Sequence, residues 1–393
     1  MKIVQINTSF TAGSTGKICH SVSRMLTEKE VENYILHTQS GCADPNGISY
    51  TSTSYIKLQA LKSRVKGNYG FNSRLATKHL ISLLDQIKPD VVHLHNLHGH
   101  NGHLGMLLSY FKDNEVKLYW TFHDCWAFTG YCPHFDMFEC NKWESSCDAC
   151  PQYKHFSWFF DRSQYLFHKK KQLFEGLDLT IITPSHWLAD LVKRSFLKEY
   201  PVKVINNGID LTVFHPTEGH FREKYGCKHK KILLGVAFGW DERKGLDVFV
   251  ELSKRLNDTY QIVLVGTNDQ LDKCLPKNII SIHRTANQEQ LAEIYSEADL
   301  FINPTREETY PTVNMESLAC GTPVLTFKTG GSPEILDDTC GAVVEKNDIG
   351  ALENMVYYIC ENKPFSLDDC LKRAKNFNRY DKFQEYLKLY GVE

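Results

Sequence analysis

The segment DLFINPTREETYPTVNMESLACGTPV, residues 299–324, divides into a strand, a loop and a helix. Residues 299–303 form a short apolar run that predicts a buried strand, and residues 312–319 have a helical pattern that ends before Gly321 and Pro323. Strand, loop and helix in this order are the repeating unit of a parallel sheet covered by helices. Such sheets bind ligands at the carboxyl ends of their strands, so the loop before residue 312 is a candidate site.

Two glutamates in this segment are placed to hold a sugar nucleotide. Glu308 lies in the loop, and Glu316 falls about one turn into the following helix. The backbone N–H groups near Thr312 and Val313, at the start of that helix, are suited to a phosphate. A carboxylate one turn further on can accept hydrogen bonds from the vicinal hydroxyls of a ribose. The alternative is a pair of solvated surface glutamates, which Pro311 and the glycine and proline after the helix disfavour.

The same alternation of strand and helix extends over the whole chain. A doubly wound parallel sheet of α/β class is therefore expected in each half. The expected strands are residues 2–7, 34–37, 90–95, 117–122, 179–183, 231–237, 261–265, 279–283, 299–303 and 323–326. The expected helices include residues 17–28, 185–194, 246–256, 288–298, 312–319 and 380–390.

The length of 393 residues predicts two domains. We expect a first Rossmann-like domain at residues 1–205, joined by the C-terminal helix 380–393, and a second at 217–379. Residues 206–216, rich in turn formers, are expected to link them.

The composition points to a cytoplasmic protein. The net charge of −2 gives no general attraction to nucleic acid, and no apolar run is long enough for a membrane span. The chain enters a strand pattern at residue 2, so no signal peptide is expected. Eight of the thirteen cysteines are scattered and are expected to be reduced, buried thiols: Cys19, Cys42, Cys227, Cys274, Cys320, Cys340, Cys360 and Cys370.

The segment from Glu308 to Val324 resembles the E-x7-E signature of the family-4 retaining glycosyltransferases, which have the GT-B architecture of two Rossmann-like domains facing across a cleft. Tyr310 and Pro311 stand where the family often has Phe-Gly. The resemblance implies that Glu308 contacts the donor sugar and that Glu316 holds the ribose of the nucleotide.

A basic turn follows the strand expected at 231–237. Lys244 matches a family lysine that grips the diphosphate of the donor, whereas Trp240 occupies the position of a family arginine. Arg243 or Arg284 is expected to supply the missing charge. Adjacent cations at a helix start favour a bound anion. The alternative is an exposed basic turn.

Two candidate features lie in the first half. Gly13 and Gly16 belong to a loop between the first strand and helix, where the resemblance implies close approach of the backbone to the donor phosphate and the acceptor. His123 follows the strand expected at 117–122, which the resemblance places near the donor sugar; packing under a loop is the alternative. Histidines between His93 and His103 are expected to line a polar acceptor loop rather than to bind a metal.

Four cysteines in one turn-rich loop suit a tetrahedral structural zinc: Cys132, Cys140, Cys147 and Cys150. Reduced thiols in a packed loop and disulfides are the alternatives. A subset of the family that assembles capsules and exopolysaccharides has a similar loop.

The resemblance implies retaining, metal-independent transfer from a UDP- or GDP-sugar to a glycan or lipid-linked glycan, in cell-surface polysaccharide synthesis. A lipid-linked acceptor would bring the enzyme to the inner face of the membrane. Two other functions are open: a nucleotide-sugar epimerase of the same architecture, and a non-catalytic nucleotide-sugar binding protein, which loss of phosphate binding at Trp240 would favour.

Overall fold

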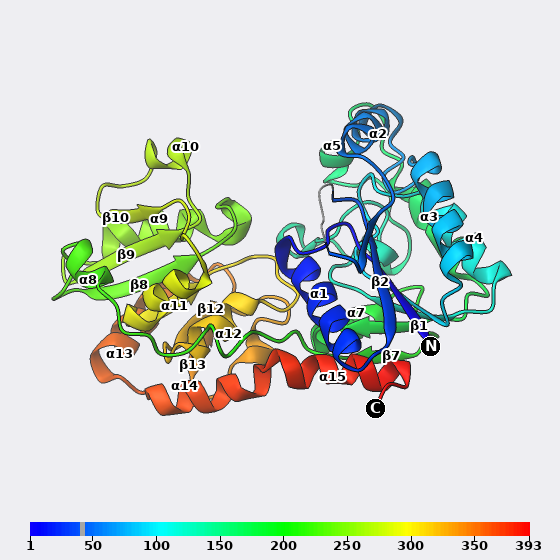
Figure 1. Ribbon diagram of the computed structural model, residues 1–393. Coiled ribbons are helices and arrows are strands. Elements are labelled where there is room, and N and C mark those ends of the chain that lie inside the picture. Colours follow the sequence, from blue (N-terminus) through cyan, green and yellow to red (C-terminus); the bar gives the residue numbers. More distant parts are fainter. Residues whose placement is uncertain (40–43) are drawn as a thin grey trace. The chain divides into compact units, whose positions relative to one another are not determined.

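The computed structural model describes residues 1–39 and 44–393, so Cys42 lies outside the described residues (Figure 1). The described chain forms two compact units. The first unit comprises Met1–Ile205 and Phe383–Glu393, and the second comprises Asn206–Lys382. Helix α15 (Arg379–Tyr390) therefore begins in the second unit and ends in the first.

The first unit is built on a seven-stranded parallel sheet in the order β3-β2-β1-β4-β5-β6-β7. Its strands are β1 (Lys2–Ile6), β2 (Glu32–His37), β3 (Gly47–Ser49), β4 (Val91–Leu94), β5 (Lys117–Thr121), β6 (Thr180–Thr183) and β7 (Val202–Val204). Its helices are α1 (Gly13–Glu28), α2 (Thr53–Lys66), α3 (Arg74–Ile87), α4 (Leu104–Asp113), α5 (Tyr153–Phe156), α6 (Ser163–Phe174) and α7 (His186–Arg194), with short 3-10 turns at η1 (Trp126–Phe128), η2 (Asp136–Phe138) and η3 (Lys142–Glu144).

The second unit is built on a six-stranded parallel sheet in the order β10-β9-β8-β11-β12-β13. Its strands are β8 (Lys231–Val236), β9 (Tyr260–Val265), β10 (Ile279–Ile282), β11 (Leu300–Asn303), β12 (Val324–Phe327) and β13 (Gly341–Val344). Its helices are α8 (Phe221–Lys224), α9 (Leu246–Arg255), α10 (Asp269–Asp272), α11 (Gln288–Glu297), α12 (Thr312–Ala319), α13 (Ile349–Asn362) and α14 (Leu367–Ala374), with 3-10 turns at η4 (Glu242–Lys244), η5 (Pro333–Ile335) and η6 (Lys375–Phe377).

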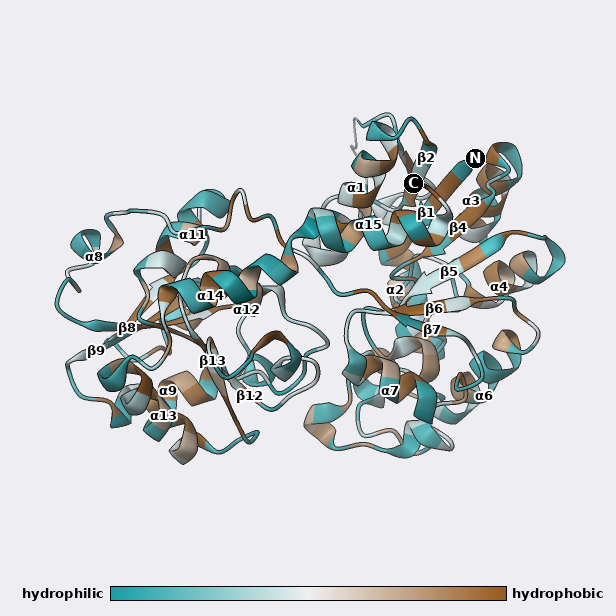
Figure 2. Cartoon of the chain, turned by 90° about the horizontal axis from the view of Figure 1, so that it is seen from below, coloured by the Kyte–Doolittle hydropathy of each residue, from teal (hydrophilic) through white to brown (hydrophobic). Residues whose placement is uncertain are grey.

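Both sheets are buried on both faces, as parallel sheets with helical crossovers require. Strands β4, β9, β11 and β12 have no exposed or half-buried residue. Figure 2 shows apolar colouring on strands of both units, whereas a surface helix such as α14 shows hydrophilic colouring along much of its length. The expected α/β class with a doubly wound parallel sheet in each half is confirmed.

Two boundaries differ from the sequence expectation. Helix α1 begins at Gly13, four residues before the expected start at residue 17, because its cap Ala12 has no side chain that could mark the start in the sequence. Residues 206–216, expected as a linker, belong to the second unit. Ile209 is buried there, and its N–H donates a hydrogen bond to the carbonyl of Phe377 over 2.8 Å.

Candidate functional site

An ion pair joins two of the predicted site residues in the second unit. Nζ of Lys244 lies 2.8 Å from Oε2 of Glu308, and the two side chains are only 23% and 19% exposed. Lys244 ends the turn η4 after β8, and Glu308 lies in the loop after β11, the neighbouring strand. Both loops leave the carboxyl edge of the sheet, which brings together residues that are far apart in sequence.

Tight packing of the backbone fixes both partners. Asp241 caps η4 by accepting a hydrogen bond from the N–H of Lys244 over 2.9 Å. Gly245 follows with φ +78°, and a Cβ there would lie 2.4 Å from the carbonyl oxygen of Pro304. Gly330 similarly leaves room for the backbone of Glu308, since a Cβ at position 330 would lie 1.6 Å from the carbonyl oxygen of Glu308. A side chain at either glycine would therefore force the backbone of these loops to shift.

Helix α12 directs its amino end to the same edge. It begins at Thr312, as the sequence predicts, and its cap Pro311 provides no side-chain hydrogen bond. Its first turn carries no acidic residue, so the positive end of the helix is not neutralised from within. Glu316 lies further along α12, half-buried, and accepts a hydrogen bond from the hydroxyl of Tyr295 over 3.4 Å.

The side chain of Trp240 turns into the core of the second unit. It is 9% exposed, its Nε1 donates to the carbonyl of Val265 over 3.0 Å, and its ring meets Phe249 edge-on. The only N–H group of the Trp240 side chain is thus engaged within the second unit. Phe238, two residues earlier in the same loop, is by contrast fully exposed.

The two arginines proposed to replace the missing cation have different surroundings. Arg243 adjoins Lys244 in η4, and its Nε lies 3.7 Å from Oδ2 of Asp241. Arg284 is exposed in the loop after β10. Arg243 is therefore the candidate that shares a turn with Lys244.

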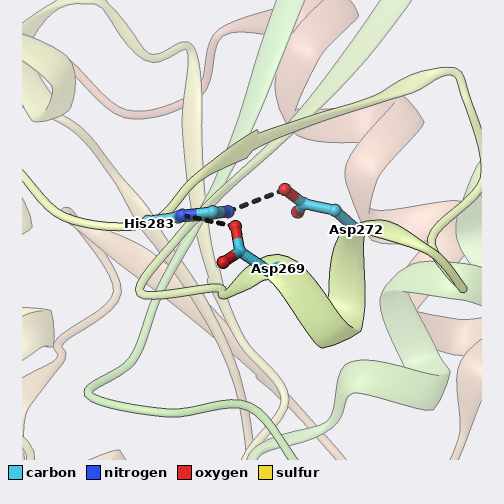
Figure 3. A group of neighbouring side chains, drawn as sticks. All are labelled: Asp269, Asp272 and His283. Atoms are coloured by element: carbon cyan, nitrogen blue, oxygen red, sulfur yellow. Dashed lines mark hydrogen bonds and ion pairs between the residues drawn. The ribbon is translucent and has the colours of Figure 1, made fainter.

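Beside Arg284, His283 is held between two carboxylates (Figure 3). Its Nε2 lies 2.7 Å from Asp272 and its Nδ1 lies 3.7 Å from Asp269. Among the described residues this is the only group of three potential metal ligands with all ligand atoms within 4.8 Å of one another. All three residues are exposed and already paired, which is typical of a surface ion pair that orders the loop after β9.

In the first unit, Gly13 and Gly16 lie at the start of α1. Gly13 has φ +71° with open space at its Cβ position. A Cβ on Gly16 would lie 2.8 Å from the hydroxyl of Ser9, so this glycine lets the preceding loop pack on the helix. No acidic residue lies in the first turn of α1, and this end of the helix is open to an anion.

His123 lies at the carboxyl end of β5, half-buried, and stacks on His95 with ring centroids 5.4 Å apart. The hydrogen-bond network assigns its tautomer. Nε2 of Gln5 donates to the carbonyl of Cys19, so Oε1 of Gln5 faces Nε2 of His95 at 3.2 Å and requires a proton there. Nδ1 of His95 then accepts from Nε2–H of His123 at 3.1 Å. In this tautomer the proton of the His123 ring is on Nε2.

Burial keeps these rings neutral. It lowers the pKa of His123 to about 4, where Asp124 opposes the shift and His98 adds to it. It also holds the pKa of His95 well below the usual value, with His93 and His123 adding to the effect. Asp124 pairs instead with His98 over 2.8 Å. The cavity lined by these residues is about 10 Å³, room for about one water molecule and not for a sugar.

Two other histidines of this region, His93 and His103, have structural partners. His93 bonds to Thr121 and to the hydroxyl of Tyr390, and Nδ1 of His103 caps α4 by accepting from the N–H of Met106. Among the described residues, these histidines form no group with metal-ligand spacing.

The four cysteines predicted to bind zinc share one neighbourhood. Burial raises the pKa of Cys147 to about 12, and Cys140 and Cys150 add to that shift, so the thiols are close to one another. Within the described part of the chain, however, no three of their sulfur atoms lie within 4.8 Å of one another. The structure therefore groups the thiols without giving the closer spacing that a four-thiolate zinc has.

None of the twelve described cysteines forms a disulfide. Of the scattered cysteines expected to be buried, Cys274 is exposed, because it lies at the end of the short helix α10 rather than in either core. The others that the structure describes are buried as expected.

Two family comparisons cover most of the chain. The model described as "Glycosyltransferase Family 4" matches residues 16–213, just over half of the chain, and that of "Glycosyl transferases group 1" matches residues 230–362. The chain belongs to glycosyltransferase family 4.

Curated relatives of this chain are named as glycosyltransferases. A protein named for colanic acid biosynthesis, WcaC of Escherichia coli K12, is 25% identical over 66% of this chain and 65% of its own length. An N,N'-diacetylbacillosaminyl-diphospho-undecaprenol alpha-1,3-N-acetylgalactosaminyltransferase of Campylobacter jejuni is 26% identical over 51% of this chain and 57% of its own length. The chain thus spans less than two thirds of these relatives.

The fold of this glycosyltransferase is GT-B. HepE of Anabaena, solved in complex with UDP, superposes with a TM-score of 0.71 at 14% identity, and the match covers 100% of both chains. The resemblance to family-4 glycosyltransferases and the expected fold class are thereby confirmed.

Sequence reasoning missed Arg306 of this glycosyltransferase. Its side chain is 10% exposed and binds Asp247 through two hydrogen bonds of 2.7 Å. Its N–H donates to the carbonyl of Arg243 over 2.8 Å, and it thereby ties the loop that carries Glu308 to η4. The arginine was visible in the sequence two residues before Glu308, but its role depends on contacts with η4 and α9 that no local pattern shows.

Proposed function

We propose that this glycosyltransferase moves a sugar from a nucleotide-diphosphate sugar to a glycan or lipid-linked glycan, with retention at the anomeric carbon. The observation that carries the proposal is the meeting of Lys244 and Glu308 beside the uncapped amino end of α12. This edge offers a cation and helical N–H groups for a diphosphate. Its carboxylate can accept hydrogen bonds from a sugar.

The chemistry follows from where charge develops. As the bond between the sugar and the diphosphate breaks, negative charge grows on the phosphate oxygen and positive charge grows on the sugar ring. Lys244, Arg243 and the N–H groups of Thr312 and Val313 stabilise the first, and Glu308 lies on the side of the second. These fixed groups perform the task of a metal, and we propose that transfer is metal-independent.

Glu316 and His123 have binding roles in this proposal. Glu316 accepts hydrogen bonds from the ribose hydroxyls. His123, at the carboxyl end of β5, lies beside the donor sugar, and its neutral ring adds no charge next to the diphosphate. Gly13 and Gly16 let the start of α1 approach the donor phosphate and the acceptor.

The donor and acceptor are proposed from the relatives. HepE is solved with UDP, and the Campylobacter enzyme is named for an undecaprenol diphosphate acceptor. We propose a UDP- or GDP-sugar as the donor and a lipid-linked glycan as the acceptor, which places this chain on the cytoplasmic face of a membrane. We propose that the chain associates with this membrane peripherally. Among the described residues, no helix has both the length and the hydropathy of a membrane span.

A thermal-shift panel of UDP-, GDP- and ADP-sugars in EDTA tests the donor class, because a ligand that binds only the folded state raises the melting temperature. A shift with one base and none with the others is expected. Conversion of the sugar without an acceptor would indicate an epimerase, and a shift with no transfer or hydrolysis would indicate a binding protein. A strict requirement for Mg²⁺ would contradict the metal-independent mechanism.

We also propose that Cys132, Cys140, Cys147 and Cys150 bind one structural zinc. Four thiols on a loop with only short 3-10 turns form a suitable donor set. Buried Lys170 lies close enough to Cys132 and Cys147 that they raise its pKa against the larger effect of burial, and its charge would offset that of the thiolates. Elemental analysis should find about one zinc per chain, absent from Cys147→Ser and retained by Cys360→Ser. Absence of metal from protein purified without chelator would refute the site.

A further inference from the structure

Helix α2 of the first unit exposes several of its apolar side chains. The residues that it buries fully are Gln59 and Ser63. Leu58, Leu61 and Val65 are exposed by 47%, 51% and 40% and fall on one helical face at the spacing i, i+3, i+7. A surface helix normally buries such a face. This one leaves it uncovered.

A second apolar group adjoins the end of this helix. Trp158, Phe159 and Phe160 are consecutive and exposed by 49%, 64% and 56%. The N–H of Trp158 donates to the carbonyl of Arg64 over 2.8 Å, which joins the aromatic segment to α2. Figure 1 shows α2 and α5, the helix just before this segment, at the same end of the first unit. We name the six side chains Leu58, Leu61, Val65, Trp158, Phe159 and Phe160 the apolar face.

The aromatic segment is held in place rather than hanging free. Tyr131 donates its hydroxyl hydrogen to the carbonyl of Gly67, at the end of α2, and accepts a hydrogen bond from the N–H of Arg162 over 3.0 Å. The guanidinium of Arg162 donates to Asn68 over 2.8 Å. Three exposed aromatic rings on a fixed backbone are pre-organised to enter an apolar medium at low entropic cost.

The charge around the apolar face is positive. No Asp or Glu occurs between Asp44 and Asp85, and α2 carries Lys57, Lys62, Arg64 and Lys66, all exposed. Asp161, which directly follows the aromatic segment in sequence, accepts hydrogen bonds from the N–H groups of Cys150 and Ser163. The basic side chains are thus not neutralised by acids of the same helix.

We propose that the apolar face docks onto the surface of an anionic lipid bilayer. Exposed aliphatic and aromatic side chains among lysines and arginines fit the interfacial region, where rings lie at the headgroups and cations meet anionic lipids. A second copy of the chain would present the same positive charge and be repelled. A nucleic acid would match the charge but gives no partner for Leu58, Leu61 and Val65. The inference rests on the proposed function, since a lipid-linked acceptor lies in such a membrane.

Vesicle binding tests this without any acceptor or sugar transfer. The purified chain should sediment with phosphatidylglycerol-containing vesicles at low salt, and much less with phosphatidylcholine vesicles. Trp158 is the exposed member of the six tryptophans, so its emission should shift to the blue on binding and be quenched by brominated lipid. Failure of the wild-type chain to bind anionic vesicles would overturn the proposal, whether or not it transfers sugar.

Variants locate the binding. Trp158→Ser, Phe159→Ser and Phe160→Ser together should lower the partition coefficient at least about 10-fold. Lys62→Gln, Arg64→Gln and Lys66→Gln should lower it about fivefold per charge on anionic vesicles only. The matched control is Tyr358→Ser with Leu367→Ser, each 50% exposed in the second unit, and should bind as wild type.

Melting temperature and nucleotide binding check that each variant is folded. Equal binding by wild type and both variants would overturn the assignment of this face. If the wild-type chain is a dimer and the aromatic variant is a monomer, the face is assigned to a second copy instead. If the chain binds an oligonucleotide in preference to vesicles, the face is assigned to a nucleic acid.

Discussion

The ion pair of the second unit and the histidine cluster of the first occupy equivalent places, at the carboxyl ends of neighbouring strands, but their electrostatics are opposite. The site of the second unit has partly exposed lysine and glutamate side chains, those of Lys244, Glu308 and Glu316. His93 and His95 are buried, and burial lowers the pKa of these rings and of His123. Under the proposed function, the charged site around Lys244 is suited to a diphosphate, and the neutral histidines are suited to uncharged hydroxyls.

The largest effect is expected when the cation of the second unit, Lys244, is removed. Lys244→Ala should lower the rate of transfer by about 10²- to 10³-fold, because it deletes a fixed charge at the leaving group. Binding of the nucleoside diphosphate should weaken far more than binding of the bare nucleoside, measured by calorimetry. Lys254→Ala, an exposed lysine of α9, is the control and should keep full activity. Equal weakening of both ligands would show that Lys244 does not bind the phosphates.

The next largest effect is expected when the carboxylate of Glu316 is removed. Glu316→Gln keeps the shape of the side chain and loses charge-assisted hydrogen bonds to the ribose, so nucleotide affinity should fall about 10- to 100-fold. Calorimetry of the nucleoside diphosphate measures it, with Glu361→Gln on the exposed surface of α13 as the control. An unchanged affinity would remove Glu316 from the binding site.

The neutral histidines should make the first unit sensitive to acid. Burial lowers the pKa of His100 and His103 to about 4, below the ordinary value of 6.5 that they regain on unfolding. The unfolded chain therefore binds more protons between these values. Stability should be full above about pH 6.5 and be lost as the pH falls toward 4.

His103→Asn tests the contribution of one histidine to this acid sensitivity. Asparagine can still cap α4 but does not titrate. It should reduce the slope of unfolding free energy against pH by at most about 1.4 kcal/mol per pH unit, in denaturant titrations between pH 4 and 6.5. The exposed His229→Asn is the control. The same acid slope in wild type and His103→Asn would show that His103 is not among the groups responsible.

The smallest effect is expected at the surface cluster near Arg284. His283→Asn removes an exposed pairing with Asp269 and Asp272 and should change the unfolding free energy by less than about 1 kcal/mol. Chemical denaturation measures this change. A larger loss, or stabilisation of wild type by added divalent cations, would show that the cluster is more than an ion pair.

The second unit was more predictable from sequence than the first. The bounds of α12 agree with the expected residues 312–319 because a buried strand, a proline-containing loop and a terminating glycine signal them locally. Contacts distant in sequence have no such signal. The inward turn of Trp240 depends on Val265 and Phe249, and the clamp of Arg306 depends on Asp247.

Helix α2 shows a different limit. Leucines at 58 and 61 with a valine at 65 have the spacing of a core-facing stripe, and sequence periodicity cannot tell which side of a helix the fold covers. The tautomer of His123 is likewise fixed by Gln5 and His95, which come from other strands of the sheet.

Helix α15 has a consequence for how the chain is made on the ribosome. Tyr386 and Tyr390 are buried against β4 and β5 of the first unit, yet they are synthesised after the whole of the second unit. Residues 1–205 thus leave the ribosome while the surface around His93 and Tyr119, which these tyrosines later cover, is still exposed. At about 5–20 residues per second, that surface would wait roughly 10–40 s for its cover, exposed to chaperones and proteases. Loss of the last eleven residues would make this unfinished state permanent, so a late nonsense mutation should act as a folding defect in the half that was translated first.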